Sequence, residues 1–179
     1  MKRRFVVLAF LVGMAVASCS RDAQSLPFSV IPQPSEVTLI GGGYDLKSSD
    51  LILSDNLDEK VKSAIAEFAE HLQTVAGGRN RVVSGEDGRG VVFLVDPALG
   101  NEAYRLDITK NKAIVAANSY NGFIYALQTI GQMLPAEFYG RELASGVDFV
   151  IPCGTIKDAP RFSYRGVLID VGRHFYSVW

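Results

Sequence analysis

The chain has 179 residues, with 18 lysines and arginines against 19 aspartates and glutamates, and a formal net charge of −1. That length suits one domain, and the near balance of charge provides no long-range field for nucleic acid or an anionic surface. Nucleic-acid binding is therefore not expected, and composition alone does not identify a partner.

The first residues predict export. A basic Lys-Arg-Arg segment at positions 2–4 precedes an apolar run at 5–17, and small residues lead to Cys19. This order is typical of a secretory signal. The apolar run is shorter than the roughly 20 residues that a helix needs to span a bilayer, so a permanent transmembrane helix is the weaker interpretation.

The order Val-Ala-Ser-Cys at positions 16–19 resembles a bacterial lipoprotein signal. The resemblance implies that residues 1–18 are removed and that Cys19 is acylated with several fatty chains, which makes membrane anchoring stable. Ordinary cleavage after a small residue, with an incidental cysteine, is the alternative. Residues 19–30 form a short, polar segment without periodicity, as expected of a tether.

Folding is expected to begin near Val30, after which the chain alternates between strand and helix patterns. Apolar, strand-like runs occur at 37–40, 51–53, 91–95, 104–108 and 113–117. Gly41–Gly43 is expected to form a turn, and Asn111 to serve the turn of a hairpin. The remaining cysteine, Cys153, lies in an apolar segment and is expected to be a small buried side chain.

Two segments have the apolar spacing of amphipathic helices. Residues 57–76 carry apolar side chains at intervals of three and four. Asn56 and Glu59 could form a capping box, and Gly77 suits the left-handed exit. Asp58 and Glu59 are accordingly attributed to the helix start. A second helix is expected from about Ser119, with Pro135 ending it.

These elements predict a two-layer α/β domain over residues 31–152, consisting of a sheet and two helices. Residues 150–160 have the pattern of an extended linker, and Tyr164–Val171 that of a new strand. The spacing of cysteine and histidine fits no zinc site, and no phosphate loop or nucleophile elbow occurs in the sequence. No metal or organic cofactor is indicated.

The closing stretch, Pro160 to Trp179, is the one segment with candidate chemistry. Its strand pattern is apolar on both faces, as in a buried parallel strand, and it is flanked by Arg165, Asp170, Arg173 and His174. Because an unpaired buried charge is costly, these residues form either an ion-paired strand terminus or a polar site. The residues alone favour the structural interpretation.

Residues 158–175, DAPRFSYRGVLIDVGRHF, resemble the opening of the catalytic barrel in glycoside hydrolase family 20, the β-N-acetylhexosaminidases. Sequences of that family contain the motifs Asp-x-Pro-Arg-Phe, Arg-Gly and Leu-Asp-x-x-Arg-His-Phe, in this order and at this spacing. The segments IPQP (31–34), EAYRL (102–106) and GFIYALQT (122–129) are similar to its N-terminal domain, in the same order. The resemblance implies that residues 153–179 contain a linker and the first strand of an incomplete (β/α)₈ barrel.

The resemblance implies hydrolysis of terminal, non-reducing N-acetyl-β-hexosamine with retention, in which the substrate's 2-acetamido group is the nucleophile. Arg165 matches the arginine that binds hydroxyls of the terminal sugar, and Asp170, Arg173 and His174 match positions that support the site. The catalytic Asp-Glu pair follows His-x-Gly-Gly in the family, and that stretch is absent from this sequence. We therefore expect an N-terminal fragment, inactive alone, of an exported, lipid-anchored enzyme acting on N-acetylhexosamine glycans. A non-catalytic, lipid-anchored module that binds glycan or protein is the alternative.

Overall fold

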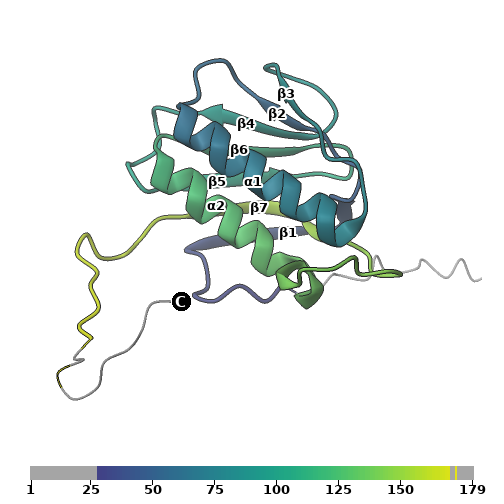
Figure 1. Ribbon diagram of the computed structural model, residues 1–179. Coiled ribbons are helices and arrows are strands. Elements are labelled where there is room, and N and C mark those ends of the chain that lie inside the picture. The colour runs from purple at the N-terminus through teal and green to yellow at the C-terminus, as the bar shows by residue number, and fades with distance from the viewer. Residues whose placement is uncertain (1–27, 170–171, 173–179) are drawn as a thin grey trace, which may run out of the picture.

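A computed structural model describes residues 28–169 and 172 of the protein (Figure 1). Its elements, in chain order, are β1 (Glu36–Asp45), β2 (Leu51–Leu53), α1 (Glu59–Ala76), β3 (Val82–Ser84), β4 (Val91–Val95), β5 (Tyr104–Ile108), β6 (Ala113–Ala117), α2 (Tyr120–Met133), the 3₁₀ helix η1 (Ala136–Tyr139) and β7 (Val150–Asp158). The signal, the tether up to residue 27 and Cys19 lie outside the described residues. Within them, no helix is both long and apolar enough to cross a membrane.

The seven strands form one mixed sheet in the order β1-β7-β5-β6-β4-β2-β3. The pairs among β1, β7, β5 and β6 are antiparallel, and those among β6, β4, β2 and β3 are parallel. Both long helices cover the same face of the sheet (Figure 1). The predicted two-layer α/β architecture is confirmed, and so is the hairpin, in which β5 pairs directly with β6.

The core lies between the helices and this face. α1 buries Val61, Ile65, Leu72 and Val75 at intervals of three and four, while its polar positions stay outside. Among the described residues, all buried members of the core lie between Val30 and Ile156. The described segment that follows β7 therefore contributes no residue to this core.

The ends of α1 show which capping predictions were correct. The N-cap is Asp58, whose side chain accepts a hydrogen bond from the Lys60 amide, and Gly77 ends the helix at φ 66°. Asn56, which we expected to cap the helix, instead accepts a hydrogen bond from the Ser54 hydroxyl at 2.7 Å. The backbone is still extended at Asp58, and the helix begins at the next residue. The Asp58 carboxylate, and not the Asn56 amide two residues before it, is therefore close enough to accept from the first free amides of the helix.

The turn predicted at Gly41–Gly43 was wrong. β1 continues through these glycines and pairs with β7 on both sides of them, with a register irregularity between Leu39 and Gly43. Gly41 and Gly42 have φ values of 76° and 87°, which other residues rarely adopt. The glycines therefore form a bulge within an edge strand.

The linker predicted for residues 150–160 was also wrong over most of its length, because Val150–Asp158 is strand β7, between β1 and β5. Pro152 is of a type that strand interiors rarely contain, because proline has no N–H to donate. It lies opposite Gly43, beside the bulge of β1, and β5 pairs only with residues from Gly154 onward. At that point the ladder can accommodate a residue without an N–H.

The barrel strand predicted for Tyr164–Val171 is not formed in its described part. Residues 164–169 have no regular structure and pair with no described strand. The side chains of Val167, Leu168 and Ile169 are 87%, 96% and 74% exposed. A strand needs hydrogen-bonding neighbours, and the described residues provide none here.

Candidate functional site

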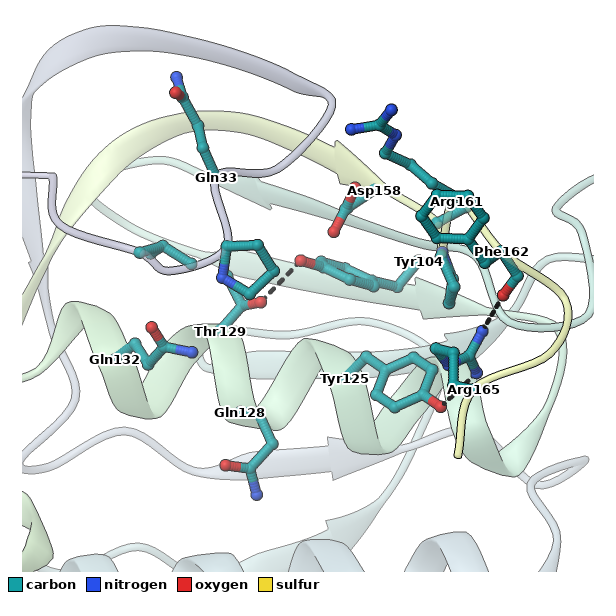
Figure 2. A pocket seen from close by; sticks show the side chains of 14 residues that line it. Gln33, Tyr104, Tyr125, Gln128, Thr129, Gln132, Asp158, Arg161, Phe162 and Arg165 are labelled. Atoms are coloured by element: carbon teal, nitrogen blue, oxygen red, sulfur yellow. Dashed lines mark hydrogen bonds between the residues drawn. The ribbon is translucent and has the colours of Figure 1, made fainter. Parts of the chain in front are cut away.

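A cavity lies between the start of the domain, helix α2 and the segment that follows β7 (Figure 2). Its volume is about 490 Å³, within the range of small-molecule sites. The lining residues from the domain are Val30, Pro32, Gln33, Tyr104, Tyr125, Gln128, Thr129, Gln132 and Asp158, and those from the following segment are Ala159, Pro160, Arg161, Phe162 and Arg165.

The inner wall is fixed by a buried hydrogen bond between β5 and α2. The hydroxyl groups of Tyr104 and Thr129 lie 2.6 Å apart, and both side chains are buried (Figure 2). Burial raises the pKa of the Tyr104 phenol to about 12, although its bond to Thr129 lowers it in part. The Tyr104 phenol therefore stays uncharged over the physiological pH range.

Arg165, the predicted sugar-binding residue, lies at one end of the cavity. Its Nη2 donates hydrogen bonds to Glu102 Oε1 at 2.7 Å and to the Tyr125 hydroxyl at 3.2 Å, and its Nη1 donates to the Phe162 carbonyl. The Tyr125 hydroxyl also donates to Glu102 Oε1, at 3.1 Å. We call Glu102, Tyr125 and Arg165 the clasp, because they join residues 159–165 to the domain.

The clasp is an electrostatic contact at the protein surface. The hydrogen bond from Arg165 holds the pKa of the Glu102 carboxyl below its ordinary value, and Glu102 raises the pKa of Arg165 in turn. The Arg165 side chain remains 42% exposed, so water screens the pair. Its Nη2 edge is committed to Glu102 and Tyr125, which leaves less of the guanidinium fork for another ligand.

The other wall carries both polar and aromatic groups. Asp158, at the end of β7, accepts a hydrogen bond from the Ser35 amide through Oδ1 at 3.0 Å. The Arg161 guanidinium lies 5.6 Å from the centroid of the Phe162 ring, a cation–π distance. Gln33, from the segment before β1, also contributes to the lining, but its side-chain amide points away from Asp158 and Phe162 (Figure 2).

Sequence reasoning identified one member of this site. Arg165 was singled out, whereas Asp170, Arg173 and His174 lie outside the described residues and stay predictions. Glu102, Tyr125 and Asp158 were not proposed as site residues, although all three stand within the segments that carried the resemblance. Their meeting depends on the order of strands in the sheet, which a linear pattern does not contain.

Within the described residues, no cluster of three or more His, Cys, Asp or Glu side chains could hold a metal ion. The acidic pair at Glu86–Asp87 lies in a turn. Asp87 accepts a hydrogen bond from the Gly88 amide at 2.8 Å and is paired with Lys112. Cys153 is buried, and burial raises the pKa of its thiol, which disfavours the nucleophilic thiolate.

Comparison with known proteins links the folded domain to one family. The family described as Glycosyl hydrolase family 20, domain 2, matches residues 28–159. A beta-hexosaminidase of Vibrio furnissii is 26% identical over 92% of this chain and 26% of its own length. A beta-N-acetylhexosaminidase of Cellulomonas fimi is 29% identical over 84% of the chain and 30% of its own length.

Among solved structures, the GH20 beta-N-acetylhexosaminidase of Streptomyces coelicolor A3(2) superposes with a TM-score of 0.74 at 28% identity. The superposition covers 86% of this chain and 31% of that enzyme. The chain thus spans between a quarter and a third of the length of these three relatives.

Proposed function

The chain belongs to glycoside hydrolase family 20, and on this basis we propose that it is the N-terminal part of an exported β-N-acetylhexosaminidase. The reaction is hydrolysis of terminal, non-reducing N-acetyl-β-hexosamine with retention, assisted by the substrate's 2-acetamido group. The observation that carries the proposal is the family match over residues 28–159, which coincides with the folded domain.

In this proposal the chain supplies a scaffold and one substrate-binding residue. Arg165 binds two neighbouring hydroxyls of the terminal sugar, for which a planar guanidinium fork is suited. Because its Nη2 is held by Glu102 and Tyr125, Arg165 must leave the clasp to present this fork. Pairing of Tyr164–Val171 as the first barrel strand would supply that movement.

The proton donor and the residue that orients the acetamido group are expected in a His-x-Gly-Gly-Asp-Glu stretch. The 179 residues contain no such stretch. We therefore propose that the chain has no hydrolase activity by itself, and that the complete protein has it.

The proposal includes attachment to the bacterial cell envelope through lipid on Cys19, on its periplasmic or outer surface. Its support is the order of basic, apolar and small residues before that cysteine. Metabolic labelling with a tagged fatty acid tests it: the wild-type protein should become labelled, and Cys19→Ser should not. A labelled Cys19→Ser protein would contradict the anchor.

The test of catalysis compares the complete gene product with residues 20–179, using a chromogenic N-acetyl-β-glucosaminide. The complete protein should release the chromophore, and residues 20–179 should not. In the complete protein, Arg165→Ala should lower kcat/KM by about 10- to 100-fold, as expected for lost hydrogen bonds from a charged group. Tyr120→Ala, an exposed side chain that does not line the cavity, is the control.

Two results would contradict the proposal. One is release of the chromophore by residues 20–179 alone. The other is a reading frame without a His-x-Gly-Gly-Asp-Glu segment after Trp179, which would instead favour a non-catalytic glycan- or protein-binding module.

A further inference from the structure

Three exposed apolar side chains lie at the end of the molecule where both long helices stop (Figure 1). Ile31 is 79% exposed, and its amide donates a hydrogen bond to the Gln132 side chain, in the last turn of α2. Tyr139 is 59% exposed, and its hydroxyl lies beside the same turn. Leu143 is 58% exposed and lies against Gly77, which ends α1. We call Ile31, Tyr139 and Leu143 the apolar end.

Buried neighbours hold two of these side chains on the outside. Phe138 is buried, and its ring centroid lies 5.4 and 5.0 Å from those of two aromatic rings of α1. The next side chain, Tyr139, therefore points outward. The Ala144 amide, next to Leu143, donates to a carbonyl in the last turn of α1 at 2.8 Å. Single exposed apolar residues are ordinary, but several at one end of a domain indicate an interaction surface.

The tether joins the domain at this same end. In the proposed lipoprotein, residues 20–27 separate the acylated Cys19 from Phe28. Eight residues reach at most about 30 Å when fully extended, and a folded domain of this size is about 35 Å across. Ile31 follows Phe28 by three residues. The anchor therefore keeps the apolar end close to the membrane, and the opposite end lies near the limit of its reach.

The chemistry of the apolar end suits the interface of a bilayer. Isoleucine and leucine side chains gain from leaving water, and tyrosine can place its ring among acyl chains and its hydroxyl among headgroups. The neighbouring exposed charges, Glu137, Arg141 and Glu142, are of mixed sign. An anionic membrane therefore has no electrostatic advantage over a zwitterionic one.

We propose that the apolar end docks on the surface of the bilayer that holds Cys19, so that the domain rests on the membrane. This inference rests on the proposed lipid anchor. The anchor makes docking an intramolecular event, for which a weak apolar contact suffices. A second contact also strengthens attachment by lipid. The start of α2 and the clasp, to which α2 contributes Tyr125, then lie on the side away from the lipid.

The test uses residues 19–179, coupled through the Cys19 thiol to a maleimide lipid in phosphatidylcholine vesicles. Cys153 is buried, so Cys19 is the thiol that reacts. The sequence contains one tryptophan, Trp179, and Trp179→Phe permits a single reporter elsewhere. Tyr139→Trp places it at the apolar end. Tyr120→Trp is the matched control, because Tyr120 is 43% exposed and begins the 14-residue helix α2, about 20 Å from its other end.

Bromine on the acyl chains quenches the emission of a tryptophan that touches lipid, and iodide quenches one that faces water. Tyr139→Trp should be quenched by bromine and protected from iodide, and Tyr120→Trp should behave in the opposite way. Leu143→Asp, added to Tyr139→Trp, should lower the ratio of docked to free domains by about tenfold, as expected for losing one buried leucine side chain. Ile31→Asp, on a separate segment, should act in the same direction.

Ser63→Asp adds the same charge at an exposed position near the start of α1 and should leave the bromine quenching of Tyr139→Trp unchanged. Circular dichroism should show the same unfolding transition for all variants, because each changes an exposed side chain. A loss of quenching in Ser63→Asp equal to that in Leu143→Asp would assign the effect to charge and overturn the apolar contact.

Equal quenching of both reporters by iodide would show that nothing covers the apolar end, which overturns the proposal. Protection of Tyr139→Trp from iodide without bromine quenching would assign this surface to protein, such as a second copy of the chain, and overturns it as well. Chemical coupling supplies the anchor in this assay, so failed docking counts against the apolar end alone. Absence of fatty acid from Cys19 in the metabolic labelling counts against the proposed anchor.

Discussion

Strand β7 and residues 165–169 are both apolar stretches near the end of the described chain, but only β7 is part of the sheet. β7 lies between β1 and β5 and is largely buried, with Ile151 fully inaccessible. Residues 165–169 extend away from the sheet, with their apolar side chains in water (Figure 1). The stretch with the cleaner strand pattern is the one that forms no strand.

The difference shows that a stretch forms a strand only where neighbouring strands can hydrogen-bond to it, whatever its own residue pattern. β7 contains Pro152 and Gly154, both poor strand residues, yet β1 and β5 supply hydrogen bonds on its two sides. Residues 165–169 carry Val167, Leu168 and Ile169, but no described strand lies beside them. Four experiments test this contrast and its surroundings, and they follow in order of expected effect.

The largest effect is expected from Ile151→Ala. Removing most of a fully buried side chain leaves a cavity, which should lower the free energy of unfolding by about 2–5 kcal/mol. Its counterpart, Ile169→Ala, changes an exposed side chain and should stay within about 0.5 kcal/mol of the wild type. Urea unfolding followed by circular dichroism measures both, and equal losses would refute the contrast.

Gly154→Ala tests how closely β7 approaches β1. A Cβ at this position would lie 2.3 Å from the Thr38 carbonyl oxygen, so the strands must separate. A loss of about 1–3 kcal/mol is expected, as for overpacking. Gly100→Ala, whose added Cβ would find its nearest neighbour, the Ala103 Cβ, at 3.8 Å, should be nearly neutral. Loss of the same size in both variants would exclude the close approach as the cause.

Alkaline pH should weaken the domain through Tyr104. Its folded-state pKa is about 12 because of burial, against an ordinary value of 10.0. The unfolded state therefore loses its proton first, and stability present below pH 10 should fall between about pH 10 and 12, by about 2 kcal/mol. The free energy of unfolding of Tyr104→Phe should decline less over this pH interval. At pH 8 the variant should be less stable than the wild type by about 1 kcal/mol, because it lacks the hydrogen bond to Thr129. An identical decline in both proteins would exclude Tyr104.

The smallest effect on stability is expected at the clasp. Glu102→Gln weakens the bond to Arg165 without touching the core, so trypsin should cleave after Arg165 faster while the unfolding midpoint hardly moves. Because the pKa of Glu102 is lowered in the folded state, the clasp is intact above its ordinary pKa and is lost as pH falls through the lowered value. Glu142→Gln, for which no described partner is found, is the control. Unchanged cleavage in Glu102→Gln would show that the clasp does not hold this segment.

The sequence located one residue of the candidate site. Arg165 was found because its neighbours carry a recognisable order of residues. Glu102 and Tyr125 lie 63 and 40 positions before it and contact it only because β5 and α2 are neighbours near the point where β7 ends. No local spacing predicts such a meeting. The position of Asp158 at the cavity also depended on β7, which the linker interpretation had excluded.

The two long helices, five of the strands and the resemblance to the family could be predicted from the sequence, because they follow from the spacing of apolar residues and from short ordered motifs. Three further features became apparent only in the folded chain: Gly41–Gly43 forms a bulge, Val150–Asp158 is an inner strand, and residues 164–169 pair with no described strand. The physical reason is common to all three. The hydrogen bonds of a strand are made with residues distant in sequence, so its existence is a property of its neighbours and not of its own residues.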